Sequence, residues 1–346
     1  MAILETAIDG GLHVTYEGPS CTRCILPAAF PLISFDNEGT CSYCVAEPDV
    51  RQATRDEIRA AVESCLAGGD QERIYDCIVL YSGGKDSTRA LMAAHDLGLR
   101  ILAFTLDNSF MSAAVSTNMQ RVVDALSVEH MVMRPPAPRM RRLYRVSLEH
   151  SFQADTLMYS TGSCGSCIGV VLSASMRLAK SLRVPLLIGG WTPGQLTTNA
   201  VLEEEFLRNI VTKQLEQLDT VELGHHLATF TDDASRPVRL VNPLYAAGYS
   251  ERSTLDTIST LGWTAPSDTD SCSTNCRLNG LLIVDHIERH GYHPYVYELA
   301  HHVRIGALTR AEALHKVTHL EISRPSVTAV ARELGLNNDR SSRTDR

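Results

Sequence analysis

A run of six residues, Ser82-Gly-Gly-Lys-Asp-Ser87, holds the types of group that bind phosphate. An apolar segment at 77–81 leads into it, and a helical pattern starts at Asp86. Glycines let the backbone approach an anion closely, and the N–H groups at a helix N-terminus attract negative charge. Lys85 adds a full positive charge. We therefore predict a phosphate site made of Ser82, Gly83, Gly84, Lys85, Asp86 and Ser87.

Asp86 is the best candidate for a magnesium ligand in this run. It adjoins the phosphate site, and carboxylate oxygens suit this hard ion. The run does not match the GxxxxGK[ST] loop of P-loop NTPases, because its glycines and lysine are spaced differently. The alternative interpretation is an ordinary connection between a strand and a helix, which the complete set of six residues disfavours.

The six residues resemble the PP-loop of the ATP pyrophosphatase superfamily, and the resemblance extends over about residues 70–200. In that family the loop holds the pyrophosphate end of ATP together with Mg²⁺. The resemblance implies that a substrate oxygen is adenylated, that a nucleophile then displaces AMP, and that oxygen is replaced by nitrogen or sulfur. Lys85 and Asp86 would be the catalytic residues, acting by neutralising charge and positioning the reactants.

Two further residues join the predicted ATP site. Asp107 follows the second expected strand, where PP-loop proteins bind adenosine, although an ordinary turn residue explains it equally well. Gly189 follows a buried strand at 185–188. The carboxyl ends of parallel strands share one edge of a sheet, so Ser82, Asp107 and Gly189 are expected on the same side.

Four cysteines near the N-terminus have the spacing of a zinc knuckle, with CxxC at 21–24 and again at 41–44. Such pairs can place four thiolates tetrahedrally around Zn²⁺ at ~2.3 Å, whereas four unrelated buried thiols would not explain the pairing. Because sulfur would fill all four positions, the zinc is expected to be structural. The segment also resembles the N-terminal knuckle of N-acetyl sugar amidotransferases. The predicted zinc ligands are Cys21, Cys24, Cys41 and Cys44.

A second set of cysteines admits several interpretations. Cys164 and Cys167 start a helical pattern, whose N-terminus favours thiolate by lowering the thiol pKa, and Cys272 and Cys276 follow about a hundred residues later. The favoured interpretation is a [4Fe–4S] cluster held by three or all four, because the arrangement resembles iron–sulfur-dependent tRNA-thiolation enzymes. In those enzymes the cluster lies beside the ATP site, and its free iron is thought to carry sulfur. The alternatives are a second Zn(Cys)4 site, a metal-free pair that carries persulfide sulfur, and inert thiols.

One feature of the tRNA-thiolation enzymes is missing. Their fourth strand is usually followed by a Gly-His-Asn-x-x-Asp-like stretch, whereas this chain has Gly189-Gly-Trp-Thr-Pro-Gly-Gln195 and no acid before Glu203. A tRNA substrate is therefore not favoured, and the family's catalytic aspartate is in doubt. Gly190, Trp191 and Gln195 are candidates to shape a pocket for a small planar or sugar substrate, although Trp191 fits the core equally well.

The composition is that of a packed globular protein, with 346 residues, 44% hydrophobic residues and a net charge of −8. The negative charge argues against broad nucleic-acid binding, and a basic cluster at 134–145 is interpreted first as a solvated helix face. Most of the ten cysteines fall into close pairs, which indicates metal rather than disulfides in a cytosolic protein. We expect no signal peptide, no membrane segment and a cytoplasmic location.

Beyond residue 50 strand and helix patterns alternate, which predicts an α/β fold with a doubly wound parallel sheet. The resemblance implies the adenine nucleotide alpha hydrolase-like version of this fold. We expect an irregular arm and the zinc knuckle at 1–50, the ATP-binding domain at 51–235, a helical extension carrying Cys272 and Cys276 at 236–336, and a disordered tail at 337–346. Residues 68–70 are expected to end the first helix.

These observations lead to one hypothesis and two alternatives. We expect an ATP-dependent sulfurtransferase that thiolates a small-molecule or nucleotide substrate with sulfur from a donor. An ATP-dependent amidotransferase would use the same adenylate with ammonia from a partner glutaminase, as the zinc-knuckle resemblance suggests. A non-catalytic, zinc-scaffolded ATP-binding protein is the third reading, and the intact phosphate site weighs against it. Each of the enzymes is compatible with a homodimer.

Overall fold

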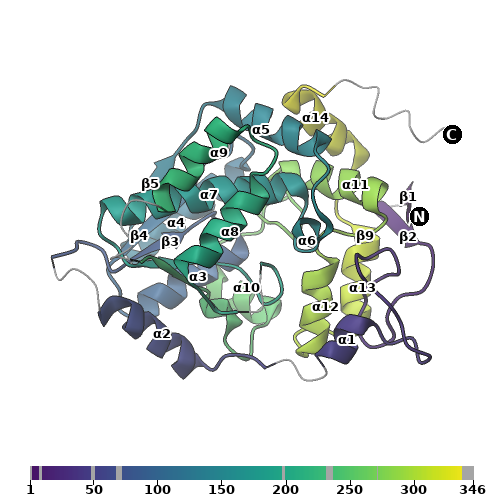
Figure 1. Ribbon diagram of the computed structural model, residues 1–346, viewed down its shortest axis with the longest axis horizontal. Helices are drawn as coiled ribbons and strands as arrows, with labels where there is room; N and C mark the ends of the chain where they lie inside the picture. The colour runs from purple at the N-terminus through teal and green to yellow at the C-terminus, as the bar shows by residue number, and fades with distance from the viewer. Residues whose placement is uncertain are drawn as a thin grey trace.

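The computed structural model describes residues 2–7, 10–47, 51–67, 72–196, 199–230, 237–270 and 272–336. Its centre is a six-stranded sheet with the strand order β5-β4-β3-β6-β8-β7. Figure 1 labels β5, β4 and β3 of this sheet. The strands are β3 (Cys77–Leu80), β4 (Ile101–Leu106), β5 (Glu129–Met133), β6 (Leu186–Ile188), β7 (Val201–Leu202) and β8 (Arg239–Val241). Neighbouring strands from β5 to β8 are parallel, and β7 runs antiparallel to β8.

Helices cover both faces of this sheet, because successive side chains of a strand point to opposite faces. Cys77 and Val79 pack with α2, α3, α4 and α10, whereas Ile78 and Leu80 pack with α5, α7 and α8. The first group comprises α2 (Arg55–Ala67), α3 (Lys85–Asp96), α4 (Ala113–Leu126) and α10 (Glu251–Ser259). The second group comprises α5 (Ala137–Glu149), α7 (Gly162–Ser181) and α8 (Glu204–Gln214), with α6 (Ala154–Leu157) and α9 (Thr220–Leu227) beside them. The predicted doubly wound α/β class is confirmed.

Successive strands are added first on one side of β3 and then on the other, so the strand order reverses between β3 and β6. The chain runs from β3 outward to β4 and β5, and then returns to β6 on the other side of β3. In sheets of this kind a ligand crevice opens at the carboxyl ends of the strands where the order reverses. The residues 82–87 follow β3 and the pair Gly189-Gly190 follows β6, so both glycine turns flank this crevice.

Helix α7 (Gly162–Ser181) bears on the expectation that the chain has no membrane segment. With 20 residues and a mean hydropathy of 1.2, it is long and apolar enough to cross a membrane by these two measures. In the structure it packs against α5, α8 and the strands β3 and β6, and Leu172, Met176 and Ala179 are fully buried there. Its apolar character is therefore explained by its position in the protein core.

The first residues do not form the irregular arm that we expected. β1 (Ala2–Thr6) and β2 (Leu12–Tyr16) form an antiparallel hairpin, and β9 (His319–Leu320) pairs with β2. Leu12 and Val14 alternate with more exposed residues and are buried. The prediction was wrong because the partner that buries this alternation lies about three hundred residues away.

The C-terminal part is helical as expected, with α11 (Leu278–His290), α12 (Val296–Arg304), α13 (Arg310–Thr318) and α14 (Arg324–Leu334). The N-terminal cysteine segment, including α1 (Ser42–Ala46), packs on α12 and α13 (Figure 1). β8 extends the main sheet beyond residue 235, and the proposed domain boundaries stay predictions. The helix breaker at 68–70 and the tail at 337–346 lie outside the described residues.

Candidate functional site

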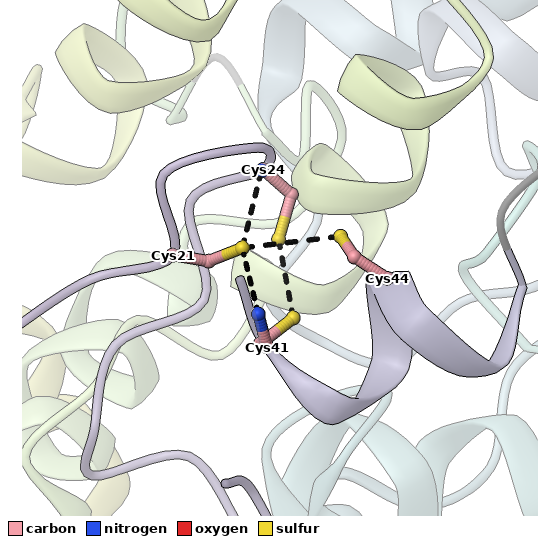
Figure 2. Close-up of side chains that lie close together, drawn as sticks. All are labelled: Cys21, Cys24, Cys41 and Cys44. Carbon is pink, nitrogen blue, oxygen red and sulfur yellow. Dashed lines mark hydrogen bonds between the residues drawn. The ribbon is translucent and has the colours of Figure 1, made fainter. Parts of the chain in front are cut away.

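The four N-terminal cysteines point toward one another (Figure 2) and are all buried. Their ligand atoms lie within 4.8 Å of one another. The Sγ atoms of Cys21 and Cys44 are 3.9 Å apart, and those of Cys24 and Cys41 are 3.8 Å apart. Sulfurs bound tetrahedrally at ~2.3 Å from one zinc ion are about 3.8 Å apart. The predicted set is thus brought together with the geometry of a structural Zn²⁺ site, and the identity of the metal stays a prediction.

Backbone turns and one arginine hold this cysteine set in place. The N–H groups of Cys24 and Cys41 donate to Cys21 Sγ at 3.4 and 3.2 Å. Arg310 of α13 donates to the carbonyl oxygens of Cys21 and Cys24 at 2.8–3.2 Å. Hydrogen bonds from the Cys24 and Cys44 thiols hold the pKa of Cys41 far below its usual value. The segment is therefore held in shape by hydrogen bonds to its sulfurs and carbonyl groups and is tied to the C-terminal helices.

The predicted phosphate site forms a tight turn between β3 and α3, and this turn requires its glycines. Gly83 has a φ of +74°, and a Cβ there would lie 2.6 Å from Val115. A Cβ on Gly190 would lie 2.6 Å from the Cα of Ser87, so the two glycine turns are in contact. Ser82 and Ser87 close the turn, with their hydroxyl oxygens 3.0 Å apart.

Lys85 is buried in a charged cluster that the sequence did not indicate. Its Nζ lies 3.1 Å from Asp86 Oδ2 and 3.5 Å from Oε1 of Glu251, the first residue of α10. Glu251 also pairs with Lys316 of α13 at 2.9 Å. Burial alone would lower the pKa of Lys85, but Asp86, Glu251 and Glu298 outweigh it and raise the pKa. The amine therefore stays protonated and can neutralise phosphate.

Two more side chains extend this cluster. Tyr249 donates a hydrogen bond from its hydroxyl to Asp86 Oδ1 at 3.1 Å, which orients the predicted magnesium ligand. Glu298 of α12 is partly buried and accepts a hydrogen bond from the Thr192 hydroxyl at 2.5 Å. Burial raises the pKa of Glu298 to about 7. Neither Tyr249 nor Glu298 lies in a motif, so no local signal in the sequence could have identified them.

The second cysteine set shares one cavity with the phosphate site. This cavity, of about 250 Å³, is lined by Ser82, Lys85 and Asp86 on one side. It is also lined by all four cysteines of the second set, Cys164, Cys167, Cys272 and Cys276, and by Gly190, Trp191 and Gln195. The structure therefore brings together the phosphate site, the second cysteine set and the turn after β6, which the sequence placed in separate segments.

Three of these cysteines contact polar side chains. Tyr144 donates to Cys167 Sγ at 3.4 Å, and Asn108 donates to Cys276 Sγ at 3.3 Å. The thiol of Cys164 donates to Asn279 at 3.6 Å. Such contacts are typical of residues around sulfur ligands, where they orient the sulfur and tune a bound metal. Asn108 and Tyr144 were missed because their partners are distant in sequence.

Cys272 also lines the cavity and packs toward the hydrophobic cluster of β2, β9 and α11, whereas the other three pack toward the larger cluster of the central sheet. Among the described residues, the second set does not reach the close spacing of the N-terminal set, which a single ion requires. This disfavours the alternative of a second Zn(Cys)4 site. All four cysteines line one cavity, and a [4Fe–4S] cluster held by three or all four of them stays a prediction.

The predicted lowering of the thiol pKa at the start of α7 is wrong. Burial raises the pKa of Cys164 to about 12 and that of Cys167 to about 11. Desolvation of the charged form therefore outweighs the attraction of the helix N-terminus. These thiols are expected to become thiolates only when a cation binds them.

Three predicted ATP-binding residues, Gly83, Asp107 and Gly189, are not part of the cavity lining. The Asp107 carboxylate pairs with Arg134 at 2.7 Å, and the next residue, Asn108, lines the cavity instead. A Cβ on Gly189 would lie 2.2 Å from the Asn242 side chain, so Gly189 packs into the protein. The roles predicted for Asp107 and Gly189 stay predictions.

No family model matches the chain. An uncharacterized protein of Methanocaldococcus jannaschii is 21% identical over 286 residues, which cover 82% of this chain and 86% of that protein.

Two solved structures match part of the chain. A crystal structure of a predicted subunit of tRNA methyltransferase from Methanocaldococcus jannaschii has 15% identity and a TM-score of 0.32, covering 64% of this chain and 91% of its own. An NH3-dependent NAD synthetase from Campylobacter jejuni, in complex with the nitrate ion, has 11% identity and a TM-score of 0.31, covering 61% and 96%. TM-scores this low do not establish a common fold, so function has to be argued from the site.

Proposed function

We propose that the protein is an ATP-dependent sulfurtransferase that replaces a carbonyl oxygen of a small-molecule or nucleotide substrate by sulfur. The observation that carries this proposal is the single cavity that joins the phosphate site to the second cysteine set. The resemblance of residues 82–87 to the PP-loop supports ATP as the ligand of the phosphate site. Hydrogen bonds at Cys164, Cys167 and Cys276 support a sulfur-held group opposite it.

The first step activates the substrate. The triphosphate rests on the turn after β3, where Lys85 and a Mg²⁺ ion held by Asp86 would neutralise it. The substrate carbonyl oxygen attacks the α-phosphorus, the bond from this phosphorus to the bridging oxygen breaks, and pyrophosphate leaves. The protein contributes positioning and charge neutralisation, for which a buried and protonated Lys85 is suited.

The second step replaces the oxygen. Sulfur at the oxidation level of sulfide, from a donor, attacks the activated carbon, the bond to the AMP oxygen breaks, and AMP leaves with the bonding electrons. The sulfur loses its proton, so one ATP yields AMP and pyrophosphate without net oxidation. A [4Fe–4S] cluster bound by Cys164, Cys167 and Cys276 would supply an iron that holds the incoming sulfur. Tyr144 and Asn108 orient two of these sulfurs.

The decisive experiment measures the metal content of protein purified without oxygen. We expect iron and acid-labile sulfide, with broad absorption near ~400 nm, in addition to zinc. The variant Cys164→Ala should lose the iron and the colour but keep the zinc. Cys65→Ala is the matched control, because Cys65 is a buried thiol of α2 outside both cysteine sets, and it should keep both metals.

Assays of pyrophosphate release then identify the nucleophile. Candidate substrates are tested with sulfide and with ammonia at equal concentrations. Release that depends on sulfide supports the proposal. A colourless, iron-free protein that releases pyrophosphate only with ammonia would instead be an amidotransferase. If the protein binds ATP but releases no pyrophosphate with either nucleophile, the third hypothesis, a non-catalytic ATP-binding protein, is supported.

A further inference from the structure

A short segment of the C-terminal part lies across the phosphate site. We define the strap as residues 272–277, which lead into α11. The backbone of the strap is hydrogen-bonded to the segment after β4, with the Ser112 N–H donating to the Asn275 carbonyl at 3.2 Å and the Arg277 N–H donating to the Phe110 carbonyl at 2.9 Å. The strap carries two cysteines of the cavity, one at its first position and the other at its fifth.

The strap contacts the phosphate turn through one hydroxyl group. The backbone N–H of Lys85 donates to Thr274 Oγ1 at 2.9 Å. This N–H belongs to the first residue of α3, whose N-cap, Gly84, has no side chain that could accept it. A Cβ on Gly84 would lie 3.2 Å from Thr274 Oγ1, so the glycine also makes room for the threonine. Thr274 therefore caps α3 from a distant part of the chain.

The backbone N–H of Lys85 is expected to donate a hydrogen bond to a phosphate oxygen when ATP is bound, because backbone donors at a helix N-terminus bind anions. A hydroxyl oxygen and a phosphate oxygen compete for the same donor. We propose that Thr274 takes the place of a phosphate oxygen in the free protein, and that the strap releases Lys85 when the triphosphate binds. This inference rests on the proposed function, since it takes ATP as the ligand.

The burial of the strap fits a segment that can move as a unit. All six of its residues are partly exposed, whereas Asp270 before it and Leu278 after it are 4% and 1% exposed. The Ser273 hydroxyl donates to the Asn275 side chain at 3.0 Å, which gives the strap internal order. Displacement would leave the buried anchors at both ends in place, while it would change the contacts of Cys272 and Cys276 with the neighbouring hydrophobic clusters.

The consequence is a coupling between the phosphate turn and the second cysteine set, which line the same cavity. Movement of the strap shifts Cys272 and Cys276, so nucleotide binding changes how these thiols are presented. Because such coupling is reciprocal, a group that fixes Cys276 also changes the affinity for nucleotide. The device would let the protein expose its sulfur chemistry only after the triphosphate is in place.

The first test compares three proteins by calorimetric titration with a non-hydrolysable ATP analogue. Thr274→Val removes the competing acceptor at constant shape, and Thr274→Ser keeps a hydroxyl. The free state of the valine variant loses a hydrogen bond of about 0.5–1.5 kcal/mol, so we expect it to bind the analogue about 2- to 10-fold more tightly than the wild type. The serine variant should bind like the wild type. Equal or weaker binding by the valine variant overturns the inference.

The second test needs no variant. Hydrogen exchange of the peptide covering residues 272–277 is measured in the wild type with and without the analogue. We expect faster exchange with nucleotide, because the strap leaves the phosphate turn, and slower or unchanged exchange overturns the inference while leaving ATP binding intact. If the wild type and both variants fail to bind the analogue, the proposed function falls and this inference falls with it.

Discussion

At the scale of single residues, the unexpected feature is the amount of buried charge around the phosphate turn. Lys85 meets Asp86 and Glu251 directly, and Glu298 lies close enough to influence its pKa. Buried charges are stable only when they are paired, and removing one partner leaves the others uncompensated. The positive charge that would neutralise a triphosphate thus also pairs α3 with α10 through Glu251.

Glu298 allows a prediction about pH. Burial raises its pKa to about 7 in the folded protein, from an ordinary value of 4.5. Between these two values the folded state holds more protons than the unfolded state, so the free energy of unfolding falls as the pH rises. Glu298→Gln cannot titrate and still accepts the Thr192 hydrogen bond. As the pH rises from about 4 to about 8, we therefore expect the free energy of unfolding of the variant to increase by up to about 3 kcal/mol relative to that of the wild type.

Urea unfolding of both proteins across this range measures the difference. Because Lys85, Asp86 and Glu251 are present in both proteins, their own titration largely cancels in the comparison. The gain should develop between about pH 4.5 and pH 7 and level off above it. Parallel stability curves would show that Glu298 is ionised throughout and that its burial is compensated by Lys85.

At the scale of elements, the N-terminal cysteine segment is expected to need its metal ion in order to fold. Phe30 packs against Tyr292 and Tyr297, with ring centroids 5.3 and 5.7 Å apart, so the segment contributes aromatic surface to the C-terminal helices. It contributes few other buried residues of its own besides the cysteines. A segment this small depends on its metal for folding free energy.

We expect one zinc ion per chain, and Cys24→Ser should remove it. Loss of the metal leaves the three remaining thiols without their common ligand in a buried site and loosens the contact of Phe30 with α12, so the thermal midpoint should fall by several degrees. Metal analysis and calorimetry measure both effects. Cys65→Ala is the control, because it deletes a buried thiol from another hydrophobic cluster and should keep the zinc. Equal zinc content in both variants would contradict the assignment.

Most elements of the central sheet could be predicted because their signals are local. The apolar segment before Ser82 and the helical pattern after it specify a strand, a turn and a helix in one short stretch. Likewise, the two CxxC pairs between Cys21 and Cys44 are enough to predict a metal site, because this spacing is typical of four cysteine ligands. The hairpin at the N-terminus was missed because its two short strands acquire their burial from β9 and α11, which no local pattern reveals.

The rest of the site could not be predicted for the same reason. Thr274, Glu251 and Glu298 reach the phosphate turn from three different segments, and each is an ordinary residue in its own segment. The pKa of Cys164 was predicted in the wrong direction because a helix N-terminus is visible in sequence, whereas the burial that outweighs it is a tertiary property. Motifs thus locate the chemistry, and packing decides how the groups are tuned.

At the scale of the whole molecule, the N-terminal hairpin packs against the C-terminal part of the chain. β2 lies between β1 and β9, and Leu12 packs with Ile283 and Ile287 of α11. α11 follows the strap directly and carries Asn279, the partner of Cys164. The N-terminal hairpin therefore supports the helix that holds one wall of the cavity.

This arrangement predicts unequal effects of two substitutions in the hairpin. Leu12→Ala creates a cavity at a residue that is 1% exposed, and we expect a loss of about 2–5 kcal/mol in the free energy of unfolding. Ile3→Ala changes a residue of the same hairpin that is 44% exposed, and we expect a change within about 0.5 kcal/mol. Because Leu12 supports α11, hydrogen exchange in α11 and β9 should accelerate in the first variant while exchange in β3 and β4 stays slow. Uniform acceleration would mean that the hairpin stabilises the whole molecule rather than the wall of the cavity that α11 forms.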